Sequence, residues 1–573
     1  MDNYEVSERL ASNVGDELSV YPELLKILLL NRGIKSREEA ENFLRPDYNK
    51  HLHDPFLFKD MAKAVDRIIK AVNENEKIVI WSDYDADGIP GGIILHDFFT
   101  KIQFYSFEIH IPDRNNEGFG LNEKTINRLA DDGVSLIITV DCGIGNVTEV
   151  DLANKKGIDV IITDHHMPSE KLPPALAIIN SKQENCGYPF KDLCGAGVAF
   201  KLVQALTVRI GASEHSSKLN PGWEKWLLDM AGVATISDMV PLRGENRAIS
   251  YYGLMVLRKT PRVGLGRLFQ DLKIQRKHLT EDDIGFSISP RINVSSRMGS
   301  AMDAFRLLTT RDETEAGMLS SEMTKLNNER KGLVAAMIKE IKNNLGKGEK
   351  SRHDIIVMGN PTWKPSLLGL AANTLSSEYE CPVFLWGRGS EEDLKGSCRS
   401  RNTNLIALMG NVTPGVLAEF GGHFFSGGFS VRHDKIHHLE SELRKSHELV
   451  KNADDAKEKT VIDAKASLET VSWENWEMIS RLAPFGMGNP KPVFLFENIE
   501  IYKIEEFGKE KNHIKLLFKK NNSEYVTAIS FFTGRNSFSR EPREGESINL
   551  VASMEKSVFR NFPELRLRIV DII

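Results

Sequence analysis

Three short apolar runs in the first third of the chain each end in side chains of the kind that bind metal ions. Asp83, Asp85 and Asp87 follow residues 77–82 (KIVIWS), Asp141 follows residues 135–140 (SLIITV), and Asp164, His165 and His166 follow residues 159–163 (DVIIT). Carboxylates packed this closely repel one another, and their pKa values rise unless cations lie among them. Mixed Asp and His ligands suit Mn²⁺ or Zn²⁺, and Mg²⁺ where oxygen dominates. Two metals about 3.5–4 Å apart that share a carboxylate polarise a phosphate and generate hydroxide, so these residues predict phosphoester hydrolysis.

The elements that must position these residues are the strands of one parallel sheet. From about residue 60, helix-compatible stretches such as residues 61–76 and 122–133 alternate with the three apolar runs and with residues 175–180 (ALAIIN). Strands that alternate with helices form a parallel α/β sheet, and ligands bind outside the carboxyl ends of its strands. One acidic pair after a strand is common, and an isolated DHH could be a helix cap with two surface histidines. Three such clusters at one sheet edge favour a metal site.

The remainder of the chain predicts further structural units. Residues 1–50 are typical of short helices, and residues 312–346 of one long helix or a helical pair. A second, smaller α/β unit follows to about residue 450, between charged stretches at residues 347–354 and 451–460 that we interpret as linkers. Five strand-like runs after about residue 492 have no long helix between them. This pattern is typical of a small barrel such as an OB-fold.

Composition and charge limit the class of protein. The chain has 573 residues, 41% of them hydrophobic, which suggests three or four domains. A formal net charge of −6 argues against a protein that coats duplex DNA through bulk charge, although it permits a local basic channel. The five cysteines are scattered without a CxxC pair, as in a reducing cytosol. We see neither a signal peptide nor an apolar segment near the roughly 20 residues that span a bilayer, so we expect a cytoplasmic protein with no membrane association.

Eight motifs in a fixed order resemble those of a known family. Four of them are similar to the successive motifs of the DHH phosphoesterases, namely SDYDADG (82–88), VDCG (140–143), TDHH (163–166) and ISDMVPL (236–242). Four more are similar to motifs that mark the RecJ exonucleases within that family, namely PRINVSSRMG (290–299), KGSCRS (395–400), FGGHFFSGGF (420–429) and PFGMGNPKP (484–492). The resemblance runs from about residue 60 to the C-terminus.

The resemblance implies two metal ions, Mn²⁺ or Mg²⁺, and six ligands: Asp83, Asp85, Asp87, Asp141, His165 and Asp238. Asp85 and Asp87 would each hold one ion, and Asp141 would bridge both. His165 and Asp238 would complete the ligands of the second ion, and Asp83 would lie near the first ion. Asp238 falls within a stretch that is typical of a helix, and without the resemblance its residue pattern does not mark it as a ligand.

The resemblance also implies catalytic and substrate-binding residues. His166 would face the scissile phosphate and stabilise its developing charge, and Asp164 would orient a histidine. Arg114, with Ser397 and Arg399, would form a pocket for a terminal 5′-phosphate, because the guanidinium fork binds phosphate oxygens in pairs.

The resemblance implies that four further residues contact the bound nucleic-acid strand. Phe119 would stack on a base, although a core position is an equally good interpretation of this phenylalanine. Arg291 and Arg297 would line the channel that binds this nucleic-acid strand. The glycine-rich FGGHFFSGGF segment would bring His423 toward the cleft that holds the metal site.

Several residues depart from the family pattern. Trp81 stands where many relatives have a small residue or a histidine ligand, and residues 362–369 (TWKPSLLG) replace the usual tryptophan-plus-glycine pattern. Pro90 to Gly92 replace a hydroxyl-containing turn, and Phe425 stands where small alanines are typical. These departures concern the shape of the channel and not the metal core.

The resemblance implies a domain order and a function. We expect an N-terminal helical segment (1–55), a DHH catalytic domain with a helical extension (56–311), a connecting helix (312–350), a DHHA1 substrate-binding domain (351–455) and an OB-fold nucleic-acid-binding domain (456–573). The implied activity is 5′→3′ exonuclease digestion of single-stranded DNA to 5′-mononucleotides, in recombination and repair. The expected partners of a monomeric enzyme are single-strand-binding protein and a helicase. Two alternatives are a DHH phosphodiesterase of short RNA or cyclic dinucleotides and a non-catalytic replication scaffold.

Overall fold

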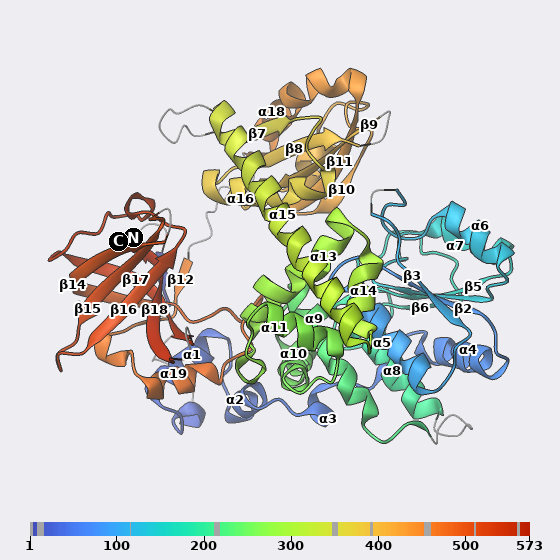
Figure 1. Ribbon diagram of the computed structural model, residues 1–573, viewed down its shortest axis with the longest axis horizontal. Coiled ribbons are helices and arrows are strands. Elements are labelled where there is room, and N and C mark those ends of the chain that lie inside the picture. Colours follow the sequence, from blue (N-terminus) through green and yellow to red (C-terminus); the bar gives the residue numbers. More distant parts are fainter. Residues whose placement is uncertain are drawn as a thin grey trace.

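A computed structural model describes residues 4–7, 16–114, 116–210, 218–345, 353–389, 393–451, 460–508, 511–558 and 562–573. Figure 1 shows a β-barrel with the N-terminal helices beside it, a larger α/β unit on the opposite side, and a smaller α/β unit above both. One long helix, α15 (Glu313–Leu345), runs between the two α/β units. The predicted linkers fall largely outside the described residues, as do the predicted domain boundaries near residues 350 and 455.

The first sheet is parallel throughout, as the alternating pattern predicts. Its order is β3-β2-β4-β5-β6, with β2 (Ile78–Ser82), β3 (Phe107–His110), β4 (Leu136–Val140), β5 (Asp159–Thr163) and β6 (Ala177–Ile179). Ser82 pairs with Val140, and Val140 pairs with Thr163. The residues that follow these three strands therefore leave the sheet at the same level.

Helices cover both faces of this sheet because its strands are apolar on both sides. One face packs against α4 (Met61–Asn73), α5 (Gly88–Lys101) and α8 (Gly195–Ile210), and the other against α6 (Glu123–Asp131) and α7 (Val147–Lys155). A helical extension follows, comprising α9 (Leu228–Ser237), α10 (Gly244–Leu257), α11 (Val263–Asp271), α12 (Glu281–Asp283), α13 (Ser289–Met298) and α14 (Ala301–Thr309).

The second sheet is mixed. Its order is β10-β11-β9-β8-β7, with β7 (Ile356–Gly359), β8 (Val383–Arg388), β9 (Asp393–Arg399), β10 (Glu419–His423) and β11 (Ser426–Arg432). Only the β7–β8 pair is parallel. Helix α16 (Pro365–Tyr379) packs on one face together with α15, and α17 (Leu405–Gly410) and α18 (Ile436–Lys451) pack on the other.

The C-terminal barrel confirms the predicted OB-fold. Its strands are β14 (Phe494–Phe507), β15 (His513–Lys519), β16 (Tyr525–Phe531), β17 (Ser547–Ser557) and β18 (Glu564–Ile572), and a β14–β17 pairing closes it. The short strand β13 (Ala464–Lys465) pairs with β14, and α19 (Trp473–Ser480) follows it. Leu28 and Leu29 of α1 (Glu23–Asn31) pack in the same apolar core as Phe494 and Phe496 of the barrel.

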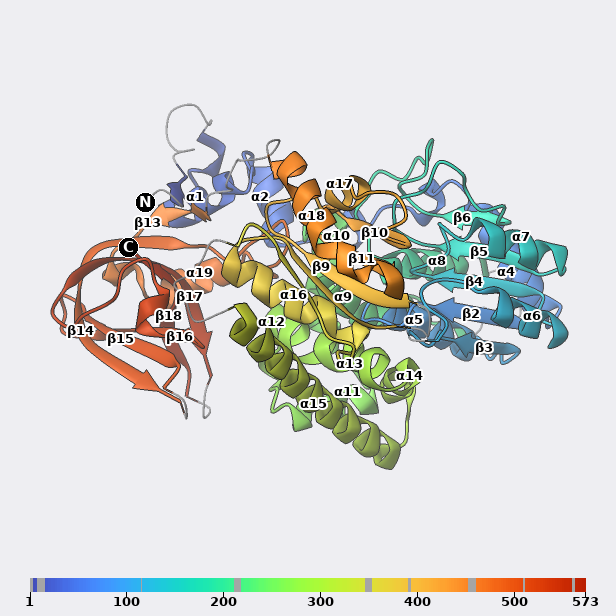
Figure 2. The ribbon, with the colours of Figure 1, turned by 90° about the horizontal axis from the view of Figure 1, so that it is seen from above.

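The N-terminal segment differs from the expectation of short helices alone. Besides α1, it contains α2 (Arg37–Leu44) and α3 (Tyr48–His51), but Tyr4–Val6 form a strand, β1, that pairs in parallel with β12 (Thr460–Ile462). This pairing supplies the backbone hydrogen bonds that a three-residue segment cannot make within itself. Tyr4 and Val6 of β1 also pack with Ile573, so β1 lies beside the C-terminal end of the barrel (Figures 1 and 2). Among the described residues, none of the helices is long and apolar enough to cross a membrane.

Candidate active site

The ends of three parallel strands place the acidic residues together at one edge of the first sheet. Asp83 continues β2, Asp141 continues β4, and Asp164 continues β5. Asp141 adopts a positive φ of 61°, which turns the chain sharply at the strand end. A Cβ on Gly195, the first residue of α8, would lie 2.4 Å from the Asp141 Cβ. Only glycine allows α8 to begin this close to the Asp141 carboxylate.

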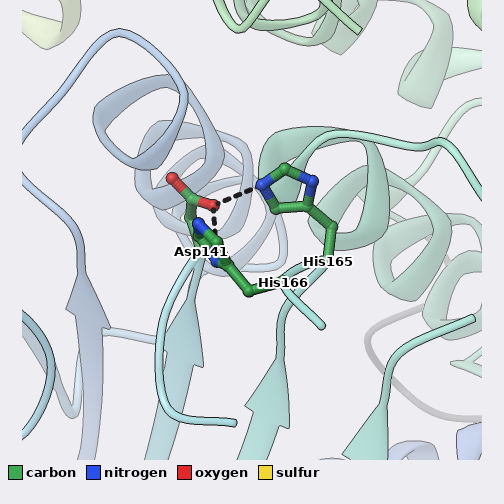
Figure 3. Close-up of side chains that lie close together, drawn as sticks. All are labelled: Asp141, His165 and His166. Atoms are coloured by element: carbon green, nitrogen blue, oxygen red, sulfur yellow. Dashed lines mark ion pairs between the residues drawn. The ribbon is translucent and has the colours of Figure 1, made fainter. Parts of the chain in front are cut away.

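His165 lies among three carboxylates. Its Nε2 is 3.2 Å from Asp141 Oδ1, 3.7 Å from Asp238 Oδ2 and 3.8 Å from Asp87 Oδ2. Figure 3 shows that His165 and His166 both approach the same Asp141 carboxylate oxygen, Oδ1, which lies 3.9 Å from His166 Nδ1. Burial, followed by the charge of His166, lowers the pKa of His165 to about 3. The ring is therefore neutral at physiological pH and presents a nitrogen suited to a metal.

The potential ligand atoms fall into two main groups. Asp83, Asp85 and Asp141 form one, and Asp87, His165 and Asp238 form the other; within each group the ligand atoms lie within 4.8 Å of one another. Asp141 also groups with the two histidines, so its carboxylate stands between the two main groups. This arrangement has the form of a two-metal site with one shared acid.

The donor set fits divalent cations. Within the described part of the chain, the buried Oδ1 atoms of Asp83 and Asp141 have no hydrogen-bond partner, a costly state for a carboxylate unless a cation binds it. Burial, followed by neighbouring carboxylates, raises the pKa of both groups well above the usual range. The same two causes raise the pKa of Asp87 to about 6 and that of Asp238 to about 9.

Backbone amides fix the two central acids. Asp85 Oδ1 accepts hydrogen bonds from the N–H groups of Asp87 at 2.8 Å and Gly88 at 3.1 Å. The Asp87 carboxylate accepts from Gly195 at 2.6 Å and Ala196 at 2.8 Å, at the start of α8. Asp87 thus caps the N-terminus of α8. The sequence analysis did not predict this contact, although the GAG sequence at the start of an apolar helical stretch is a usable signal for it.

Asn293 was also not identified from the sequence, although it lies within the PRINVSSRMG motif. Its Oδ1 accepts a 2.9 Å hydrogen bond from the Ala86 N–H. Helix α13 thus contributes a side chain that holds the loop carrying Asp85 and Asp87, in addition to the amides of α8.

His166 and Asp164 form a directed pair. Nδ1 of His166 is 2.8 Å from Asp164 Oδ1, and Asp164 also accepts from the N–H groups of Ile144, His165 and His166. Burial alone would lower the pKa of His166, but the hydrogen bond to Asp164 and its charge raise it. Burial would raise the pKa of Asp164, and the bond to His166 lowers it instead. The pair therefore favours an ionised Asp164 beside a protonated His166.

Three arginines gather beside the acidic cluster. Arg114 lies 4.9 Å from the ring centroid of Tyr84, the residue between Asp83 and Asp85 in the sequence. Burial, followed by the charge of Arg114, lowers the pKa of Arg297 to about 10. Burial and the charge of Arg114 also lower the pKa of Arg399, which donates to the carbonyl oxygens of Cys398 and Gly427. Among the described residues none of the three forms an ion pair with a carboxylate, so their charge is available to an anion.

The first turns of α16 hold this cluster together. Arg297 donates to the Ser366 carbonyl oxygen at 2.7 Å, and the Ser366 hydroxyl donates to the Arg297 carbonyl oxygen at 2.9 Å. A Cβ on Gly369 would lie 2.9 Å from Arg399 Nη2 and 3.6 Å from Ser397 Oγ. The unusual TWKPSLLG stretch therefore keeps a glycine where α16 meets Ser397 and Arg399.

A second basic group was only partly predicted. Arg291 is buried on α13, and burial, followed by the charge of Arg330 on α15, lowers its pKa. The Nε atoms of Arg291 and Arg330 are buried without a hydrogen-bond partner in the described structure. Lys331 is close enough that both arginines lower its pKa, after burial. Nothing in the sequence pattern of α15 marks Arg330 or Lys331.

Three other positions have different surroundings. Phe119 is 53% exposed, and its ring centroid is 5.8 Å from that of His166, so the phenylalanine lies at the site and not in the core. His423 lies on the exposed edge strand β10, and it belongs to none of the ligand groups found among the described residues. Trp81 is buried on the sheet face covered by α6 and α7, with its ring 4.4 Å from that of His110.

The glycines that replace the hydroxyl-containing turn have a packing role. A Cβ on Gly91 would lie 2.5 Å from Val140 Cγ1 and 3.1 Å from the Ala196 backbone. Helix α5 therefore approaches both the sheet and α8 more closely than any larger residue permits.

Comparison with known proteins agrees with this geometry. The model of the DHH family N-terminal domain matches residues 77–235, and that of the RecJ OB domain matches residues 462–571. The single-stranded-DNA-specific exonuclease RecJ of Bacillus subtilis (strain 168) is 34% identical over 560 residues, which cover 97% of this chain and 68% of the relative. The protein of the same name from Haemophilus influenzae is 30% identical over 530 residues, 90% of each chain.

A solved structure has the same architecture. The crystal structure of RecJ from Thermus thermophilus in complex with Mn²⁺ superposes with a TM-score of 0.80 at 25% identity, covering 97% of this chain and 77% of that one. The Mg²⁺ complex of the same protein gives a TM-score of 0.74 at 23% identity, over 97% and 76% of the two chains. Fold and acidic site together define a DHH phosphoesterase with a C-terminal OB-fold. Within that class, the chain belongs to the RecJ family.

Proposed function

We propose that this chain is a 5′→3′ exonuclease that hydrolyses single-stranded DNA to 5′-mononucleotides. The observation that carries the proposal is the position of Arg114, whose guanidinium lies over Tyr84, the residue that joins Asp83 to Asp85. A receptor for a terminal phosphate thus adjoins a site for phosphodiester hydrolysis. The relatives named above as single-stranded-DNA-specific exonucleases support the choice of substrate.

Six side chains would hold two divalent cations. Asp83, Asp85 and Asp141 would bind one, and Asp87, His165 and Asp238 the other, with Asp141 shared. Bound Mn²⁺ or Mg²⁺ polarises a phosphate and supplies hydroxide at neutral pH. The chain's own contribution is to keep His165 neutral and to fix Asp85 and Asp87 through backbone amides, so that the ligands do not reorganise during turnover.

His166 would act on the phosphate itself. Asp164 accepts a hydrogen bond from Nδ1 and raises the pKa of His166. In the protonated ring, Nε2 also carries a proton, which it can donate to a phosphate oxygen. A protonated imidazole is a stronger donor than a neutral one and stabilises negative charge that develops in the transition state. Phe119, beside His166, would stack on the base of the nucleotide being removed.

The arginines beside the metal site would set the direction in which the DNA is digested. An enzyme that starts at a 5′ end must recognise something that internal positions lack, and the dianionic terminal phosphate is such a feature. Arg114, Ser397 and Arg399 offer two guanidinium forks and a hydroxyl. Arg291, Arg297 and Arg330, with His423 on the second sheet, would follow the strand as it leaves the site.

The two alternative functions have weaker support. A scaffold that has lost catalysis would not need six carboxylate and imidazole ligands grouped around unpartnered oxygen atoms. A phosphodiesterase of very short substrates would not need a separate barrel and a second basic group. A role in recombination and repair, partnership with single-strand-binding protein and a helicase, a monomeric state and a cytoplasmic location extend the proposal.

The test is digestion of end-labelled single strands in Mn²⁺, with and without a 5′-phosphate, beside a matching duplex. We expect mononucleotide release from the 5′ end of single strands, its loss in chelator, and recovery on addition of Mn²⁺. Asp141→Ala should abolish hydrolysis, whereas Asp131→Ala, at an exposed position at the end of α6, should not change it. Undiminished hydrolysis by the Asp141→Ala protein would overturn the two-metal proposal.

A further inference from the structure

The loop that carries Asp238 leaves α9 in an unusual conformation. Asp238 is the C-terminal cap residue of α9, and the next residue, Met239, has a φ of 59° although it is not glycine. Met239 is 66% exposed, so its own side-chain packing does not explain this conformation. A left-handed non-glycine residue persists where the surrounding structure determines its position, so contacts farther along the loop must hold it.

Those contacts come from the barrel side of the molecule. The Leu242 N–H donates to the Met487 carbonyl oxygen at 2.7 Å, and Arg243 Nε donates to the Gly488 carbonyl oxygen at 2.7 Å. Gly488 has a φ of +72°, and a Cβ there would lie 3.1 Å from Pro241 Cβ. The turn at residues 486–489 therefore touches three consecutive residues of the loop, beginning three positions after Asp238.

The turn is itself rigid. Gly486 and Asn489 exchange backbone hydrogen bonds of 2.9 and 3.1 Å. Asn489 is fully buried, and its Nδ2 donates to the carbonyl oxygens of Leu482 and Pro484, both at 2.8 Å. Its Oδ1 accepts from Arg32 Nε, at the end of α1, at 2.7 Å. Every polar atom of the Asn489 side chain is thus used to hold the turn in one shape.

We propose that the turn at residues 486–489 is a positioning element for the metal ligand Asp238, so that the barrel unit sets the affinity of the second metal site. Asp238 is the one ligand of the six that does not follow a strand of the first sheet. Its position depends on the end of α9 and on the loop that the turn holds. This inference rests on the proposed function, because it takes Asp238 as a ligand.

The test measures Mn²⁺ binding to the full chain by calorimetry, without DNA. Gly488→Ala forces a Cβ against Pro241 in a left-handed position. We expect it to weaken one of the two Mn²⁺ sites by about 10-fold, the lower end of the effect of losing a direct partner of a metal ligand, because the turn reaches Asp238 only through residues 241–243. Gly545→Ala is the matched control, because Gly545 has a similar φ of +76° just before β17 but a Cβ added there would meet open space. Arg243→Ala removes only the side-chain hydrogen bond to the turn and should weaken the same Mn²⁺ site less. This variant replaces Gly488→Ala in the test if Gly488→Ala does not fold.

Kinetics then separate positioning from general damage. At saturating Mn²⁺ the Gly488→Ala protein should recover kcat, with an unchanged KM for single strands, since neither the phosphate receptor nor the channel is altered. If wild type binds two Mn²⁺ ions and Gly488→Ala binds both as tightly as Gly545→Ala does, the inference is wrong. If wild type itself binds fewer than two, it is the proposed function that fails.

Discussion

The hydroxyl of Tyr4 donates a 2.7 Å hydrogen bond to the Asp571 carboxylate, so the first described strand and the last strand of the barrel are held together. The same side of the molecule contains α1, whose leucines lie in the barrel's own core. Helices α1 and α2 and the barrel are therefore parts of one packed body, although more than 400 residues separate α1 from β14 in the sequence.

This shared core makes the barrel sensitive to changes in α1. Leu29 is fully buried, and Leu29→Ala should cost about 2–5 kcal/mol through lost burial and the resulting cavity. We expect faster amide exchange in β14–β18, measured by hydrogen exchange and mass spectrometry. Leu449→Ala, at a position that is 65% exposed, should change stability by no more than about 0.5 kcal/mol. Unchanged exchange in the barrel of Leu29→Ala would show that the two parts do not share a core.

The acidic cluster should make the metal-free protein less stable at high pH. Folding raises the pKa of Asp87 from 3.8 to about 6 and that of Asp238 from 3.8 to about 9. A carboxyl whose pKa rises on folding binds protons more tightly in the folded state. Its stabilising contribution is complete below its unfolded pKa and is lost as pH rises through the folded pKa. In chelator we therefore expect Tm to fall between about pH 4 and pH 9.

Two comparisons isolate this effect from other titrating groups. Asp238→Asn should flatten the upper part of the Tm profile, because it removes a carboxyl that titrates at high pH. Saturating Mn²⁺ should raise Tm most at the alkaline end, since cations then replace the lost protons. A profile in chelator that is the same for wild type and Asp238→Asn would contradict the raised pKa.

Arg399 should control the preference for a phosphorylated 5′ end. Losing one charged hydrogen-bond partner costs about 1.5–3 kcal/mol, or roughly 10- to 150-fold. Arg399→Ala should reduce cleavage of 5′-phosphorylated strands by about that factor and largely erase their advantage over 5′-hydroxyl strands. Arg401→Ala, two residues along and exposed, is the control. Steady-state rates on both substrates decide the outcome, and a retained preference would place the receptor elsewhere.

Arg330 should act on the strand beyond the cleavage site. If this half-buried arginine binds one phosphate, Arg330→Ala should lower the slope of log affinity against log salt by about 0.7, the value for one single-strand phosphate. Lys339→Ala, on an exposed part of the same helix, should leave the slope unchanged. Fluorescence anisotropy with a long strand, in Ca²⁺ or with Asp141→Ala to prevent hydrolysis, provides the measurement. An equal slope for both variants would remove Arg330 from the channel.

Most of the acidic site could be predicted from the residues that directly follow the strands of the first sheet. Parallel strands end at one edge, so acids that directly follow β2, β4 and β5 must meet there whatever the rest of the chain does. The order of strands and helices, the long helix α15 and the barrel follow from periodicity and turn residues, which are local properties. Asp238 is the exception, because it follows a helix and not a strand of this sheet. Helix periodicity does not indicate that the residue after α9 will lie beside Asp87 and His165.

The distant segments that complete the site could not be predicted from the sequence, because they are brought together by packing between whole units. Arg330 lies near Arg291 because α15 packs along α13, and the turn at residues 486–489 lies against Pro241 because the barrel docks on the helical extension. Tyr4 meets Asp571 for a similar reason. These contacts join residues tens to hundreds of positions apart, and each depends on packing between whole surfaces. Spacing within a sequence records the period of a helix or strand, but it does not record which surfaces will meet.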